Sequence, residues 1–223
     1  MSGSGADAFS RLLYPMLSAQ PSASAAVLEE LAAAPRDKLA ESNRLRLEVL
    51  ERSGTEIVAC AHALAARVRR GGRVLACGNG GSATGAADLV AELMAPPPPH
   101  RAVGALCLTA DVSVVTAIAN DIGVAEVFTR QLMALGRPED AVVAVSTSGN
   151  SPNLVAALRE AAGRGMLTVS LTGYDGGRMA TEGRPDHSLV VRSSSVHRIQ
   201  EVQTTLQHLL LELLWNELEQ EER

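Results

Sequence analysis

The sequence predicts an α/β fold in which helices cover both faces of a central five-stranded parallel sheet, giving a three-layer sandwich. Two observations point to this class. From residue 71 onward, short apolar runs alternate with helical segments. Hydrophobic residues make up 46% of the 223 residues and aromatic residues only 2%, so the core is built from aliphatic side chains. A formal net charge of -5 and the lack of a long apolar run argue against a basic nucleic-acid binder and against a membrane-spanning protein.

The first third of the chain is expected to be helical. Residues 1–24 are interpreted as an N-terminal arm, and no basic leader precedes a long hydrophobic stretch, so no signal peptide is predicted. Residues 25–70 carry apolar side chains at helical spacing, and Pro35 is expected to divide them into a helical hairpin. The hairpin is expected to pack on the later domain or on another subunit, and residues 25–223 to form one domain.

Five apolar runs are predicted as buried parallel strands. They cover residues 73–77, 104–108, 141–145, 167–171 and 188–191, and Gly, Asp, Ser or Thr residues bound each run. Ligands of such sheets bind at the carboxyl ends of the strands. The stretch 196–219 is predicted to be a long helix whose dense leucines favour burial in an oligomer interface.

The loop after the first strand reads Gly78-Asn79-Gly80-Gly81-Ser82 and leads into a helix. Its glycines permit positive φ and close backbone approach, the Ser82 hydroxyl can cap the helix, and a helix N-terminus favours an anion. The spacing matches neither the Walker A pattern nor GxGxxG, so no nucleotide cofactor is expected. A purely structural turn explains the loop about equally well.

A second polar loop, residues 146–151, follows the third strand and precedes Pro152 and a helix at residues 153–164. Its hydroxyls offer side-chain donors for one phosphate without any cation, and Pro152 suits a helix start. The alternative is a solvated serine-rich turn. The hydroxyl-bearing residues are Ser146, Thr147, Ser148 and Ser151.

Five motifs in this order resemble the sugar isomerase (SIS) domain, a flavodoxin-like fold. They are GNGGS at 78–82, AIAND at 117–121, STSGNS at 146–151, LTGYDGG at 171–177 and RIQE at 198–201. More closely, the chain from about Leu39 to its end is similar to the phosphoheptose isomerases. The resemblance implies conversion of sedoheptulose 7-phosphate to D-glycero-D-manno-heptose 7-phosphate through an enediol. It also implies a homotetramer with active sites at subunit boundaries. Independently, the odd number of cysteines without CxxC spacing argues against a disulfide scaffold and favours the cytoplasm.

The resemblance assigns roles to individual residues. The serine loop would hold the phosphate, Glu92 would be the base, and His208 would be the acid. The sugar would contact Asn79, Gly80, Gly81, Ser82, Asn120, Asp121 and Gln200.

A zinc site is in question because the family carries a zinc-binding His six residues after the GNGGS serine, where this chain has Asp88. A carboxylate also binds zinc, so a site of Asp88, Glu92, Gln200 and His208 stays open. The family often carries Asp where this chain has Gly85, so the helix after the glycine loop is the least typical part of the match.

Two other functions compete with this one: a non-catalytic phosphosugar-binding or assembly SIS protein, and an isomerase of another phosphosugar. The joint presence of Glu92, Gln200 and His208 favours the enzyme, since a scaffold has no need of them. Among weaker candidates, Asp111 can approach the sugar and Asp175 is interpreted as a turn residue. His197 and Arg198 are expected at the surface.

Overall fold

The computed structural model describes residues 25–220, with side chains from Pro35 onward, and the predicted arm at 1–24 lies outside these residues. The chain divides into two compact units between Ala40 and Glu41. This boundary falls inside helix α3 (Ala25–Arg69), and only α3 residues are described in the first unit.

The predicted hairpin at 25–70 is wrong, because α3 is one continuous helix that contains Pro35. A proline removes a single backbone N–H, and here it follows three alanines, which have the highest helix propensity. Gly54 also lies within α3, where a glycine costs only about 1 kcal/mol relative to alanine. Neither residue therefore ends the helix.

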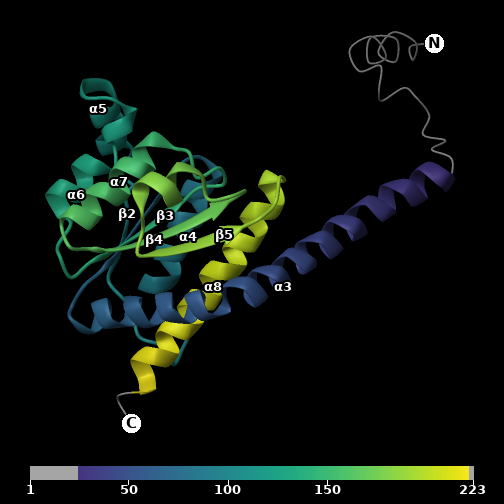
Figure 1. Ribbon diagram of the computed structural model, residues 1–223, viewed down its shortest axis with the longest axis horizontal. Coiled ribbons are helices and arrows are strands. Elements are labelled where there is room, and N and C mark those ends of the chain that lie inside the picture. The colour runs from purple at the N-terminus through teal and green to yellow at the C-terminus, as the bar shows by residue number, and fades with distance from the viewer. Residues whose placement is uncertain (1–24, 221–223) are drawn as a thin grey trace, which may run out of the picture. The chain divides into compact units, whose positions relative to one another are not determined.

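The five predicted strands form one parallel sheet in the order β2-β1-β3-β4-β5. Four of them, β2, β3, β4 and β5, are labelled in Figure 1. Each lies within two residues of its predicted bounds, and the residues of β1, β3 and β4 are all buried, as expected of a parallel sheet covered on both faces. The strands are β1 (Val74–Gly78), β2 (Ala105–Cys107), β3 (Ala141–Val145), β4 (Leu167–Gly173) and β5 (His187–Val191).

Two separate apolar clusters confirm the three layers. Strand side chains alternate between them: Val74 and Ala76 belong to the first cluster, and Leu75 and Cys77 to the second. The first also contains α4 (Gly81–Met94), α8 (Val196–Gln220) and the later part of α3. The second contains α7 (Pro152–Gly163) and α6 (Thr129–Leu135), against which α5 (Val112–Asp121) packs partly. The remaining described elements are a short 3-10 helix, η1 (Val124–Glu126), and a short π-helix, η2 (Met179–Gly183).

The leucines of α8 pack in the core of their own chain. Leu206, Leu210, Leu211 and Leu214 are each at most 3% exposed and belong to the first cluster. A wide apolar stripe is what a helix needs when it covers a sheet face. The leucine pattern is thus explained without a partner, and the interface role of α8 stays a prediction.

None of the helices in the described part of the chain is both long enough and apolar enough to cross a bilayer.

Candidate functional site

The glycine loop and the serine loop start side by side, because Gly78 of β1 pairs with Val145 of β3 at the carboxyl edge of the sheet. A reciprocal amide pair joins them. Asn79 Nδ2 donates to Asn153 Oδ1, and Asn153 Nδ2 donates to Asn79 Oδ1, both at 3.0 Å. Asn153 is only 4% exposed and was not predicted as a site residue.

The glycines of the first loop permit close packing. A Cβ on Gly78 would lie 2.4 Å from the Ser82 carbonyl oxygen, and a Cβ on Gly81 would lie 2.5 Å from Gln200 Nε2. Gly80 has a φ of 55°, in the left-handed region. The start of α4 can therefore lie directly against α8.

The predicted cap by Ser82 is wrong. Gly80 is the N-cap of α4, and no side chain caps this helix. Because the helix begins two residues earlier than a cap at Ser82 requires, Ser82 lies inside its first turn. Its side chain is buried beside α8 instead.

A cleft of about 150 Å³ lies between α4 and α8, and we call it the α4–α8 cleft. It brings together the predicted residues Gly81, Ser82, Asp88 and Gln200. Sequence reasoning missed the other polar residues of α8 in its wall. The full lining is Gly81, Ser82, Thr84, Gly85, Asp88, Val145, Gln200, Gln203, Thr204 and Gln207.

Glu92 and His208 are in contact, with His208 Nε2 3.0 Å from Glu92 Oε1. Glu92 lies one helical turn after Asp88 on α4, and His208 directly follows Gln207 on α8. Their side chains are 39% and 58% exposed, so both remain open to solvent. A carboxylate beside an imidazole can move protons at neutral pH.

The predicted zinc ligands do not assemble within one chain. Among the described residues, no group of three or more His, Cys, Asp and Glu side chains is placed to hold a metal ion. Asp88 lines the α4–α8 cleft, whereas Glu92 and His208 contact each other outside its lining. Within residues 25–220 the three charged members of the predicted set are thus not gathered at one point, and the zinc site stays a prediction.

The serine loop is held from two sides. Gln203, at 3% exposed, donates from Nε2 to the Ser146 carbonyl oxygen at 3.0 Å and to the Leu171 carbonyl oxygen at 3.1 Å. Within the loop, the Gly149 N–H donates to Ser146 Oγ at 3.1 Å. A Cβ on Gly149 would lie 2.2 Å from the Gly176 carbonyl oxygen, so the loop packs closely on the turn after β4.

Ser151 lies at the N-terminus of α7 but its hydroxyl makes no cap bond. Together with Asn79, Pro152 and Asn153 it lines a cleft of about 280 Å³ between the two loops. The other two lining residues, Val124 and Ala125, come from η1. The N-terminus of a helix and an unbonded hydroxyl both suit an anion.

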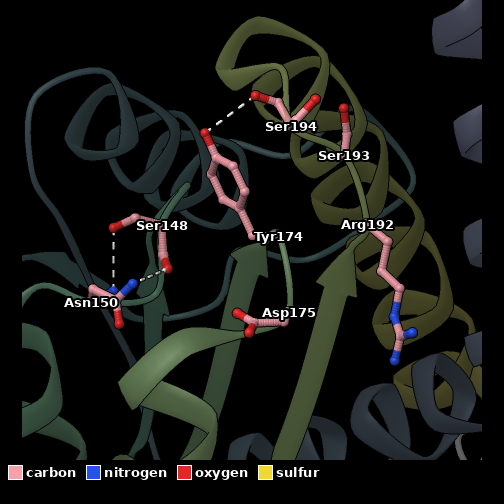
Figure 2. A pocket seen from close by; sticks show the side chains of 7 residues that line it. All are labelled: Ser148, Asn150, Tyr174, Asp175, Arg192, Ser193 and Ser194. Atoms are coloured by element: carbon pink, nitrogen blue, oxygen red, sulfur yellow. Dashed lines mark hydrogen bonds between the residues drawn. The ribbon is translucent and has the colours of Figure 1, made fainter.

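A wider cleft of about 710 Å³ lies at the ends of β4 and β5 (Figure 2). The Tyr174 hydroxyl donates to the Ser194 carbonyl oxygen at 3.2 Å. Asp175 accepts from the Gly177 N–H at 3.1 Å, which confirms it as a turn residue. Of the predicted phosphate site, only Ser148 reaches this cleft. The lining is Ser148, Asn150, Tyr174, Asp175, Arg192, Ser193 and Ser194.

Other predicted residues are not brought into these clefts. Asn120 and Asp121 are exposed at the end of α5, where Asn120 Nδ2 donates to Asp121 Oδ1 at 2.8 Å. Asp111 caps the start of α5 by accepting from two backbone N–H groups. His197 is exposed as expected, but Arg198 is half-buried and donates to Glu201 and to Ser42 of α3.

The three cysteines are free thiols. Burial, with a smaller effect of Glu56, raises the pKa of Cys60 to about 12. Burial likewise raises the pKa of Cys77. Because the thiolate is the reactive form, neither of these side chains takes part in chemistry at neutral pH.

The chain is similar to known proteins over most of its length. A SIS domain matches residues 39–173. A phosphoheptose isomerase of Roseiflexus sp. is 41% identical over 179 residues, which cover 80% of this chain and 90% of the relative. One from Desulfovibrio desulfuricans is 48% identical over 172 residues, covering 76% and 80%.

Two solved structures are also similar. The phosphoheptose isomerase from Neisseria gonorrhoeae is 37% identical with a TM-score of 0.75, and the match covers 84% of this chain and 98% of that one. The phosphoheptose isomerase from Francisella tularensis is 29% identical with a TM-score of 0.77, covering 85% and 98%.

Proposed function

The chain belongs to the phosphoheptose isomerase family of SIS-domain proteins and is an isomerase of this kind, and we propose that Glu92 and His208 carry out its proton transfers. The substrate class is a sedoheptulose 7-phosphate, and the product is D-glycero-D-manno-heptose 7-phosphate. The observation that supports the assignment of roles is the 3.0 Å contact between Glu92 and His208 beside the α4–α8 cleft.

The reaction needs one base and one acid. After the sugar ring opens, Glu92 removes a proton from C1 of the ketose, and the electron pair forms the C1–C2 double bond of an enediol. His208 gives a proton to the C2 oxygen and takes one from the C1 oxygen. Glu92 returns its proton to C2, which leaves an aldehyde at C1, so atoms and charges balance. Their 3.0 Å contact holds the base and the acid together, ready to act on one bound sugar.

The phosphate is assigned to the serine loop. This assignment is supported by the Ser151 hydroxyl, which makes no cap bond, and by the N-terminus of the 12-residue helix α7. The Asn79–Asn153 pair ties this loop to the glycine loop, so phosphate and sugar subsites keep a fixed separation.

The assembly is proposed to be a homotetramer with active sites at subunit boundaries. The segment from α5 to η1 supports this, because Val112, Ile122 and Val124 are 68%, 53% and 64% exposed. Such exposed apolar side chains favour a protein interface. Asn120 and Asp121 lie on the same segment and would reach the sugar of a neighbouring protomer.

The enzyme is proposed to work in the cytoplasm. Its three cysteines are free thiols rather than a disulfide framework, which suits a reducing compartment.

To test these roles, NMR is used to measure the rate at which the wild type, Glu92→Gln and His208→Asn convert sedoheptulose 7-phosphate. Each variant should lose about 10²- to 10⁴-fold in turnover, as expected when a general acid or base is removed. Glu212→Gln, at an exposed position of α8, is the matched control and should keep wild-type turnover. Turnover of either active-site variant within a few-fold of wild type would contradict the assigned roles.

The same assay separates the competing functions. Saturable binding of sedoheptulose 7-phosphate without conversion would favour a binding protein or an isomerase of another phosphosugar. The assay is also run with added zinc and with chelator. A loss of turnover with chelator would show that the reaction needs a metal, for which the sequence predicts Asp88, Glu92, Gln200 and His208 as ligands.

A further inference from the structure

Gln207 carries a buried amide nitrogen that has no hydrogen-bond partner among the described residues. Its side chain lies on α8, the residue is 3% exposed, and Nε2 has no hydrogen-bond partner within the described part of the chain. Gln203, one helical turn earlier, is equally buried but donates from Nε2 to two carbonyl oxygens. Buried polar groups are nearly always paired, and an unpaired one destabilises the folded state. The amide of Gln207 therefore calls for an explanation other than stability.

Packing does not supply that explanation. On one side, Gln207 lines a small apolar space together with Leu89, Leu210 and Leu211. A leucine at position 207 would continue this apolar surface and leave no polar atom unpaired. On its other side, Gln207 forms part of the wall of the α4–α8 cleft. The amide thus lies at the boundary between the core and a polar cleft.

Gly85 leaves the space in front of this amide free of a side chain. A Cβ on Gly85 would lie 3.5 Å from Gln207 Nε2 and 3.7 Å from Gln207 Oε1, which is ordinary van der Waals contact. Any side chain that extends beyond this Cβ would compete for the space around the amide. The glycine and the glutamine together therefore shape this end of the cleft.

The size and charge of the cleft indicate what it binds. Its volume of about 150 Å³ is about five times the volume of one water molecule in the liquid. That suits a few hydroxyl-bearing carbons rather than a whole sugar phosphate. The carboxylate of Asp88 in the same wall disfavours a phosphate and accepts hydrogen bonds from hydroxyl groups.

Building on the isomerase function proposed above, we propose that Gln207 is a further substrate-binding residue. Its Nε2 donates a hydrogen bond to a hydroxyl or carbonyl oxygen of the open sugar chain in the α4–α8 cleft. Ser82 and Gln200 lie in the same wall and bind neighbouring oxygens. The partner that the amide lacks in the free protein is then supplied by the substrate.

The test replaces the amide by apolar side chains of similar size, in Gln207→Leu and Gln207→Met. Gln220→Leu, at the exposed end of α8, is the matched control. Three quantities are measured: kcat/KM for sedoheptulose 7-phosphate, the calorimetric Kd for this sugar and for inorganic phosphate, and the midpoint of thermal unfolding.

Both Gln207 variants should lose about tenfold or more in kcat/KM and in affinity for the sugar phosphate, because one hydrogen bond to substrate is missing. Their affinity for inorganic phosphate should stay within twofold, since the serine loop is unchanged. Their unfolding midpoint should equal or exceed that of the wild type. A purely structural amide would instead lower the midpoint and weaken phosphate binding as well.

A kcat/KM and a Kd for the sugar phosphate within twofold of wild type in both variants would overturn the proposal. If the wild type binds the sugar phosphate but does not convert it, the isomerase function fails, and the ratio of Kd values alone decides the role of Gln207. If the wild type neither binds nor converts it, both proposals fall.

Discussion

Gln203→Met is the substitution that best tests how α8 holds the serine loop. The wild-type amide donates two hydrogen bonds, to the carbonyl oxygens of Ser146 and Leu171, from a side chain that is 3% exposed. The Leu171 carbonyl also accepts from the Ser146 N–H at 2.9 Å and so keeps one bond in the variant. The Ser146 carbonyl loses the bond that Gln203 supplies. Methionine has a similar length and volume, so packing changes little.

The magnitude follows from these contacts. Each neutral hydrogen bond contributes about 0.5–1.5 kcal/mol net, so the loss of both lowers the free energy of unfolding by about 2 kcal/mol. For a domain of this size, about 2 kcal/mol corresponds to a fall of about 4–8 °C in the unfolding midpoint. Because the Ser146 backbone is released, KM for the sugar phosphate should also rise.

The assay is thermal unfolding by calorimetry, with wild type, Gln203→Met and Gln207→Met at one protein concentration. Equal concentrations matter because an oligomer is more stable when more concentrated. The two variants carry the same chemical change one helical turn apart, yet only Gln203→Met should be destabilised. A wild-type midpoint for Gln203→Met, or equal losses in both variants, would refute the reasoning.

Two further predictions concern the hydrogen-bonded side chains of Asn153 and Asp140. Asn153→Ala removes both hydrogen bonds of the Asn79–Asn153 pair, so calorimetry should show a fall of about 4–8 °C in the unfolding midpoint, as for Gln203→Met. Steady-state kinetics should show a KM for the sugar phosphate that rises about tenfold. Burial of Asp140 acts to raise the pKa of its carboxyl, but hydrogen bonds from the Arg73 side chain, the Arg73 backbone and the Arg137 backbone outweigh it and lower the pKa. A lowered pKa stabilises the fold above the unfolded value of about 3.9 and stops doing so as the pH falls through the folded value. Asp140→Asn should therefore lower the free energy of unfolding by about 3 kcal/mol at pH 7. Denaturant titrations should find a smaller difference below pH about 3.9, and an equal difference at both pH values would contradict this.

The sheet could be predicted from the sequence because its signals are local. Each strand is a short apolar run bounded by turn residues, and parallel strands bring their carboxyl ends to one edge. The sequence therefore predicts that the polar loops at 78–82 and 146–151 lie at one edge of the sheet. That they are neighbours follows from the pairing of β1 with β3, which no local signal predicts. The predicted break at Pro35 is wrong because the cost of one proline is offset by the many helix-forming residues of the 45-residue helix α3.

The polar residues inside the helices could not be predicted in the same way. A glutamine within a helix is usually exposed, so nothing in the sequence separates Gln203 and Gln207 from a solvated residue such as Gln220. Asn153 was missed for the same reason. Their burial follows from the way α7 and α8 pack on the sheet, which is a tertiary property. Glu92 and His208 were predicted only from the resemblance to a family. They lie on two different helices, α4 and α8, so no local sequence pattern indicates their contact.

Three glutamines on α8 have different roles: some stabilise the fold, and others are proposed to bind substrate. Gln200 lies against Gly81, Gln203 binds two strand-end carbonyl oxygens, and Gln207 has no partner among the described residues. A buried amide with partners stabilises the fold, and a buried amide without one destabilises it by the same physics. The burial of the Gln203 amide is therefore explained by its hydrogen bonds within the free protein. The burial of the Gln207 amide is explained only if a ligand accepts a hydrogen bond from its Nε2. Removal of this amide should therefore raise the free energy of unfolding and lower the affinity for substrate.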